Sequence, residues 1–145
     1  MNTLKRSARV SYSARQMFEV VNNIEDYPRF LPWCQKADLI SRTDTEVVAS
    51  LEIAWKGIKK TFTTRNVLQP YNRVDITLVN GPMQHMEGIW QFIPLDEHAC
   101  KVLLDLEFNM MGNFIDRMLQ PVLQHIANTL VDAFCKRAVV LYGEN

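Results

Sequence analysis

Side chains that could act as acids, bases or nucleophiles are scattered along this 145-residue chain. The three histidines, His85, His98 and His125, lie far apart, and no serine or cysteine stands at a recognisable nucleophile spacing from them. An odd, sparse set of cysteines predicts neither a disulfide framework nor a zinc site and fits a reducing cytoplasm. These cysteines are Cys34, Cys100 and Cys135. We therefore expect no catalytic residue, no bound metal and no cofactor.

Carboxylate and amide side chains alternate with apolar ones at two places in the strand-like part of the chain. Glu87 and Gln91 could project into a cavity as an acid and a hydrogen-bond donor, or could lie on a solvated strand face. Asp105 and Glu107 share one face opposite an apolar stripe, because residues two apart on a strand point the same way. The pattern favours solvated faces over acid–base chemistry at both places.

Charge is unevenly distributed, although 16 Lys and Arg balance 16 Asp and Glu. Residues 1–73 carry 12 basic and 7 acidic side chains, whereas residues 74–145 carry 4 and 9. The zero sum disfavours a generic nucleic-acid binder, but a grouped set of cations could contact ribosomal RNA phosphates or an anionic membrane surface. The alternative is a solvated face balanced by acids from elsewhere in the fold. The cations in question are Lys56, Lys59, Lys60 and Arg65.

Periodicity predicts the elements that position these side chains. Residues 3–12 and 35–110 alternate with period two and contain short turns, which predicts seven antiparallel strands with one buried face. Between them, Ser13 and Gln16 form a capping-box pattern that predicts a helix over residues 14–22. The aromatic segment that follows holds two prolines, which predicts a second short helical turn and a loop.

Apolar residues recur at helical spacing over residues 113–142, which predicts one long C-terminal helix. Gly143 is a natural stop, and Pro121 predicts a kink or a break near Leu119. A long amphipathic helix laid across a curved seven-stranded sheet predicts one α+β domain over residues 1–145, with a cavity between the sheet and the helix.

Apolar stripes on two predicted strands and on the long helix could line that cavity, and an ordinary filled core is the alternative. Seven methionines suit a deformable wall. Two aromatic residues of the proline-containing loop are expected at the cavity mouth. The expected lining residues are Phe30, Trp33, Leu51, Ile53, Trp55, Met86, Trp90, Phe92, Phe114, Met118, Leu119 and Val122.

Three local strings carry a resemblance to a known family. They are YPRFLPWC at 27–34, GPM at 81–83 with GIWQF at 88–92, and AFCKRA at 133–138 with Tyr142 and Gly143. With this order of elements the chain resembles the helix-grip superfamily, also called START-like or Bet v 1-like and labelled polyketide cyclase/dehydrase. The strings look like its RatA branch, which bacteria share with mitochondrial coenzyme Q-binding proteins. Met83 departs from the aromatic residue expected there, and the absence of a transit peptide points to a bacterial member.

The resemblance implies a non-enzymatic function and leaves two descriptions open. Family members are described as binding ubiquinone or its isoprenoid tail in the cavity, in support of respiration, and this is the expectation we favour. The bacterial branch is also described as a ribosome association toxin that binds the large subunit and blocks subunit joining; its antitoxin partner is unknown. A cyclase-type enzyme in the same cavity is a third alternative. We expect the protein in the cytoplasm, or peripheral to the inner membrane.

Overall fold

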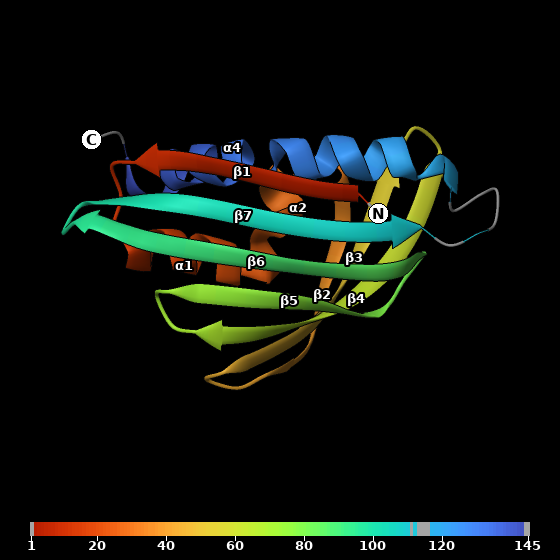
Figure 1. Ribbon diagram of the computed structural model, residues 1–145, viewed down its shortest axis with the longest axis horizontal. Coiled ribbons are helices and arrows are strands. Elements are labelled where there is room, and N and C mark those ends of the chain that lie inside the picture. The colour runs from red at the N-terminus through yellow and green to blue at the C-terminus, as the bar shows by residue number, and fades with distance from the viewer. Residues whose placement is uncertain (1, 111, 113–116, 144–145) are drawn as a thin grey trace.

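The computed structural model describes residues 2–110, 112 and 117–143, which form one sheet with helices packed against it (Figure 1). In chain order the elements are β1 (Asn2–Val10), α1 (Ala14–Asn22), the 3₁₀ turn η1 (Ile24–Asp26), α2 (Tyr27–Phe30), β2 (Cys34–Arg42), β3 (Glu46–Trp55), β4 (Ile58–Gln69), β5 (Arg73–Asn80), β6 (Met83–Asp96), β7 (Ala99–Met110) and α4 (Gln120–Tyr142).

The seven strands form a single antiparallel sheet in the order β1-β7-β6-β5-β4-β3-β2. From β2 onward each strand pairs with the next in the chain, and β1 pairs with β7, so that β1 and β2 form the two edges. In Figure 1, β1, β6 and β7 run along α4, whereas β3 and β4 rise steeply toward the N-terminal end of that helix. The prediction of an α+β helix-grip fold with a curved seven-stranded sheet is confirmed.

The predicted first helix is confirmed as α1, and its capping box explains where it begins. The Gln16 backbone N–H donates to Ser13 Oγ at 3.1 Å, and the Ser13 backbone N–H donates to Gln16 Oε1 at 2.8 Å. These two bonds satisfy donors that have no partner within the helix. The apolar side of α1 then buries Met17, Phe18 and Val21 against the sheet.

The predicted C-terminal helix breaks at Leu119, as its proline indicates, and its predicted start over residues 113–116 lies outside the described residues. Residues 117–118 are helical, Leu119 is a turn, and α4 begins at Gln120 with Pro121 in its first turn. Pro121 fits there because the first helical residues need no intrahelical N–H partner. At the other end the Gly143 N–H donates to the Val139 carbonyl at 2.8 Å, with Gly143 at φ 81°. None of the helices in the described part of the chain is long and apolar enough to cross a bilayer.

Candidate functional site: an apolar cavity beneath the C-terminal helix

A cavity of about 120 Å³ lies between the sheet and α4. Its wall is built by β3 to β7, by η1, α2 and the loop that follows them, and by one side of α4. Period-two alternation directs alternate side chains of β3 and β4 into this wall. Five of the residues predicted from the sequence lie there: Trp33, Leu51, Ile53, Met86 and Trp90.

Three predicted lining residues are buried but fill the core beside the cavity instead of lining it. Phe92 is fully buried, and its ring stacks at 6.4 Å from Trp90 and meets Phe18 of α1 edge-on at 5.9 Å. Leu119 and Val122 are buried near the start of α4, outside the cavity wall. They therefore lie in the core beside the cavity, whereas the sequence predicted that they would line it.

Three more predicted lining residues lie elsewhere, and a fourth cannot be placed. Phe30 and Trp55 line a separate surface groove of about 390 Å³, where the Trp55 ring lies 5.6 Å from the ring of His125. Met118 is 50% exposed and lies before the turn at Leu119, away from the cavity wall. Phe114 lies outside the described residues.

Two polar side chains of β4, Thr64 and Asn66, stand in the otherwise largely apolar wall, and each is only 7% exposed. Within the described part of the chain, Asn66 Oδ1 is buried without a hydrogen-bond partner. A buried acceptor left in this state costs about 1–3 kcal/mol, which a ligand that donates a hydrogen bond would recover. Asn66 therefore places an unpartnered polar atom next to the cavity wall.

The volume of the cavity limits the size of the ligand that fits inside it. Small-molecule pockets usually measure about 300–1,000 Å³, and an apolar cavity of about 150 Å³ holds one benzene. At about 120 Å³ the cavity accepts a group near the size of one ring or one isoprene unit. A longer isoprenoid exceeds this volume.

An aromatic cluster closes the end of the cavity next to α2. The Phe134 ring of α4 lies 5.2 Å from Tyr27 and 5.2 Å from Trp90, and 5.5 Å from Phe30. Tyr27 also donates its hydroxyl to the Val21 carbonyl, and burial raises the pKa of this phenol well above its usual value. These ring contacts pin α2 to α4 and the sheet.

The titratable groups around the core are held in their neutral forms. Burial raises the pKa of Cys34, Cys100 and Cys135 to about 11 each, so all three are thiols at neutral pH. Among the described lining residues of the cavity there is no Asp, Glu, His, Lys or Arg. This wall can bury and orient a ligand, and it offers no acid–base pair.

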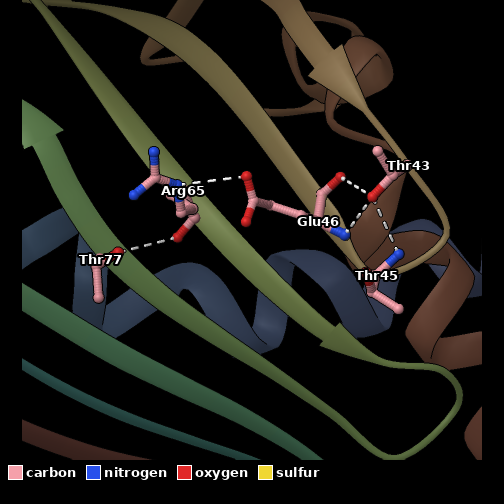
Figure 2. Close-up of polar contacts among 5 residues, drawn as sticks. All are labelled: Thr43, Thr45, Glu46, Arg65 and Thr77. Carbon is pink, nitrogen blue, oxygen red and sulfur yellow. Dashed lines mark hydrogen bonds and ion pairs between the residues drawn. The ribbon is translucent and has the colours of Figure 1, made fainter.

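The predicted basic set does not form one patch. Lys59 and Arg65 lie on the outer face of β4, as the alternation predicts, and each meets an acid of β3. Lys59 Nζ is 3.0 Å from Glu52 Oε1, and Arg65 Nε is 3.4 Å from Glu46 Oε1. Figure 2 shows the second pair, with the Glu46 backbone tied to Thr43 at the β2–β3 turn. This is the balanced face that the sequence analysis held as the alternative.

The other two cations of that set lie at different places. Lys60 is opposite the buried Ile53 in the β3–β4 register and so sits on the inner face, which corrects its grouping with Lys59. Lys56 is exposed at the tip of the β3–β4 hairpin, where it and Gly57 form a two-residue turn with φ 50° and 82°. Two positive φ values are the geometry that such tight hairpins require.

Several wall residues were missed from the sequence, among them Phe62, Thr64, Asn66, Phe108 and Phe134. The first three alternate on β4 opposite Lys59, Thr61 and Thr63, so period two could have placed them. Two of the three are polar, which hides the buried stripe from a search for apolar residues. Phe134 lies inside one of the three family strings and had been assigned only to the helix.

Comparison with known proteins places this geometry in a wider group. The family model described as "Polyketide cyclase / dehydrase and lipid transport" matches residues 10–135. A relative named ribosome association toxin RatA, from Pseudomonas aeruginosa, is 43% identical over 140 residues, which cover 97% of each chain. A Xenopus laevis protein named coenzyme Q-binding protein COQ10 homolog B, mitochondrial, is 23% identical and is covered over 57% of its length, with 92% of this chain matched.

Among solved structures, the Zhui aromatase/cyclase from Streptomyces sp. R1128 superposes with a TM-score of 0.83. The match covers 94% of this chain and 93% of that one, at 19% sequence identity. At this identity the likeness shows a shared fold and does not carry the chemistry of that enzyme across.

Proposed function

Because the chain belongs to the polyketide cyclase/dehydrase and lipid transport family, and within it to the RatA branch, we propose that it is a binding protein whose partner is the ribosome. The observation that carries the proposal is the 43% identity to a ribosome association toxin, spread over 97% of both chains. Identity of this extent from end to end leaves no separate domain to account for the relative's named property. The site of action is then the cytoplasm.

The hairpin between β3 and β4 is the contact that we assign to ribosomal RNA, as the sequence suggested. Lys56 is exposed at its tip, and Lys59 follows on the outer face. The partner of Lys59 is Glu52, but a surface ion pair contributes only about 0–1 kcal/mol, so an RNA phosphate can displace the carboxylate. Phosphate contacts of this kind supply affinity without reading sequence.

The test is the sedimentation profile of ribosomes from cells that express the protein. We expect the unaltered chain to lower the share of joined ribosomes and to co-sediment with the large subunit. The double variant Lys56→Glu with Lys59→Glu should lose both effects. Lys136→Glu is the matched control, because Lys136 is also an exposed lysine paired with an acid at 3.0 Å, but on α4. Unchanged profiles with the unaltered chain would refute the proposal.

A second candidate function is the binding of a ubiquinone-like apolar ligand in the cavity. Asn66 favours it, since an unpartnered acceptor in an apolar wall suits a ring that carries a hydroxyl. A quinol can donate to Asn66 Oδ1, whereas the oxidised quinone has no ring hydroxyl to donate, so we expect the reduced form to bind more tightly. The similarity to a coenzyme Q-binding protein supports this reading at 23% identity.

Organic extraction of the purified protein followed by mass spectrometry tests this second function. We expect an isoprenoid quinone in the extract, and we expect less of it from Ala49→Leu, which puts three more carbons into the cavity wall. The control is Ala37→Leu on β2, which lies outside the cavity lining. Extracts without quinone, together with no binding of added quinol, would exclude it.

A further inference from the structure

Three side chains with metal-ligating atoms meet on the outer face of the sheet, on the side away from the cavity. His85 and Glu87 come from β6, and Glu107 comes from β7. His85 Nε2 lies 3.1 Å from Glu107 Oε1, and the ligand atoms of all three residues lie within 4.8 Å of one another. All three are at least partly exposed, so an ion from solvent can reach them.

The register of the two strands brings these residues together. Glu87 is directly opposite Glu107, and a bulge lies in β6 just before His85. On β6, His85 and Glu87 are two residues apart and share a face, while Met86 between them lines the cavity. Because one ligand comes from the next strand, twenty residues on, spacing along the chain does not reveal the group.

The pairing of Glu87 with Glu107 needs a compensating charge. Like charges directly opposite each other on antiparallel strands repel, and this pair stands beside two further carboxylates, Asp75 and Asp105, that line the same surface groove. Lys5 and Arg73 are the cations in that groove, and Arg73 Nε donates to Asp75 at 2.7 Å. A cation at the three side chains would offset the repulsion between the two glutamates.

The distances suit a small divalent ion. Nitrogen and oxygen ligands bind Zn²⁺ at about 2.0–2.2 Å, so two ligands of a tetrahedral ion lie about 3.3 Å apart. The distance from His85 Nε2 to Glu107 Oε1, 3.1 Å, is close to this value, and Glu87 is near enough to join through a side-chain rotation. An imidazole in the set favours Zn²⁺ over Mg²⁺ or Ca²⁺, which prefer oxygen alone.

We propose that His85, Glu87 and Glu107 form a surface binding site for one Zn²⁺ ion, with solvent in the fourth coordination position. Three protein ligands and an open position leave the ion accessible to a further donor. The site does not depend on the proposed ribosome contact or on the cavity ligand, because it shares no residue with either.

The test is calorimetric titration of Zn²⁺ into chelator-treated protein. We expect one ion per chain and at least about a tenfold loss of affinity in His85→Ala, with a similar loss in Glu87→Gln. His98→Ala is the matched control, since His98 is an exposed histidine in the β6–β7 turn, and it should bind like the unaltered chain. Circular dichroism shows whether each variant is folded.

Absorption of the Co²⁺-substituted protein identifies the ligands. Nitrogen and oxygen ligation predicts weak visible bands without the strong near-ultraviolet band of a thiolate–cobalt bond, and His85→Ala should abolish the visible bands. A thiolate band would assign the ion to a cysteine and overturn the proposal. Zn²⁺ affinity within twofold of the unaltered chain in both His85→Ala and Glu87→Gln, or no Zn²⁺ binding at all, would also overturn it.

Discussion

On β4, Thr64 and Asn66 point into the cavity under α4, whereas Thr63 and Arg65 lie on the outer face beside Ser50 and Glu46. The inner side is largely apolar, and one of its polar atoms, Asn66 Oδ1, has no partner among the described residues. The outer side is charged and solvated, and its cations sit next to acids. One strand therefore contributes to two environments, and a substitution on the inner side should change stability more than a similar substitution on the outer side.

The largest expected effect comes from removing Phe134, which is 1% exposed and packs on Tyr27, Phe30 and Trp90. Phe134→Ala should lower the free energy of unfolding by about 3–5 kcal/mol, because it leaves a cavity that the core cannot close. Urea denaturation measures it. Val140→Ala, at a position 72% exposed on the same helix, should change stability by about 0.5 kcal/mol or less. Similar losses at both positions would mean that α4 is not packed as described.

A smaller effect of opposite sign is expected at Asn66. In ligand-free protein, Asn66→Leu should raise the free energy of unfolding by about 1–3 kcal/mol, because it removes the buried acceptor that has no partner among the described residues. The same change should weaken quinol binding. Denaturation and ligand titration on one preparation give both values. Thr64→Val, in the same wall, is the control for the loss of a polar group alone; if Asn66→Leu destabilises the free protein, the acceptor is satisfied.

The smallest effect is expected on the outer face, where solvent screens charge. In metal-free protein, Glu87→Gln should raise the free energy of unfolding by about 0.2–1 kcal/mol, since it removes one of two opposed carboxylates. Glu97→Gln in the β6–β7 turn serves as the control. In excess Zn²⁺ the unaltered chain should become more stable than Glu87→Gln, because the variant has lost a ligand and gains less stability from the ion. A change above about 2 kcal/mol would show that the outer face is not solvated as described.

Patterns among neighbouring residues predicted the helices and strands well. The residues of the cavity wall were harder to predict, because they depend on how distant segments pack together. The capping box of Ser13 and Gln16, the strand alternation and the break at Pro121 each depend on a few neighbouring residues. The cavity wall depends on the phase of α4 after the turn at Leu119, and Met118, before that turn, lies at the surface. Asn66 was missed because a polar residue at a buried position looks like a surface residue in sequence.

Side-chain contacts between neighbouring strands are the hardest feature to predict from the sequence, because they depend on the strand register. The pairs Lys59–Glu52 and Arg65–Glu46 follow from the β3–β4 register, so the cations that appeared grouped along the chain are partly neutralised in space. The meeting of His85 with Glu107 follows from the β6–β7 register in the same way. Register depends on turn lengths and bulges along the whole sheet, and one residue of slip reverses every face.

The most direct test is co-sedimentation of purified protein with isolated large ribosomal subunits, comparing one variant of each face. Ala49→Leu fills the cavity, and Lys56→Glu with Lys59→Glu reverses charge at the β3–β4 hairpin. If the outer face carries ribosome association, the cavity-filled variant sediments with the subunit like the unaltered chain, and the charge-reversed variant stays in the supernatant. Loss of binding by Ala49→Leu, with binding retained by the hairpin variant, would contradict this assignment.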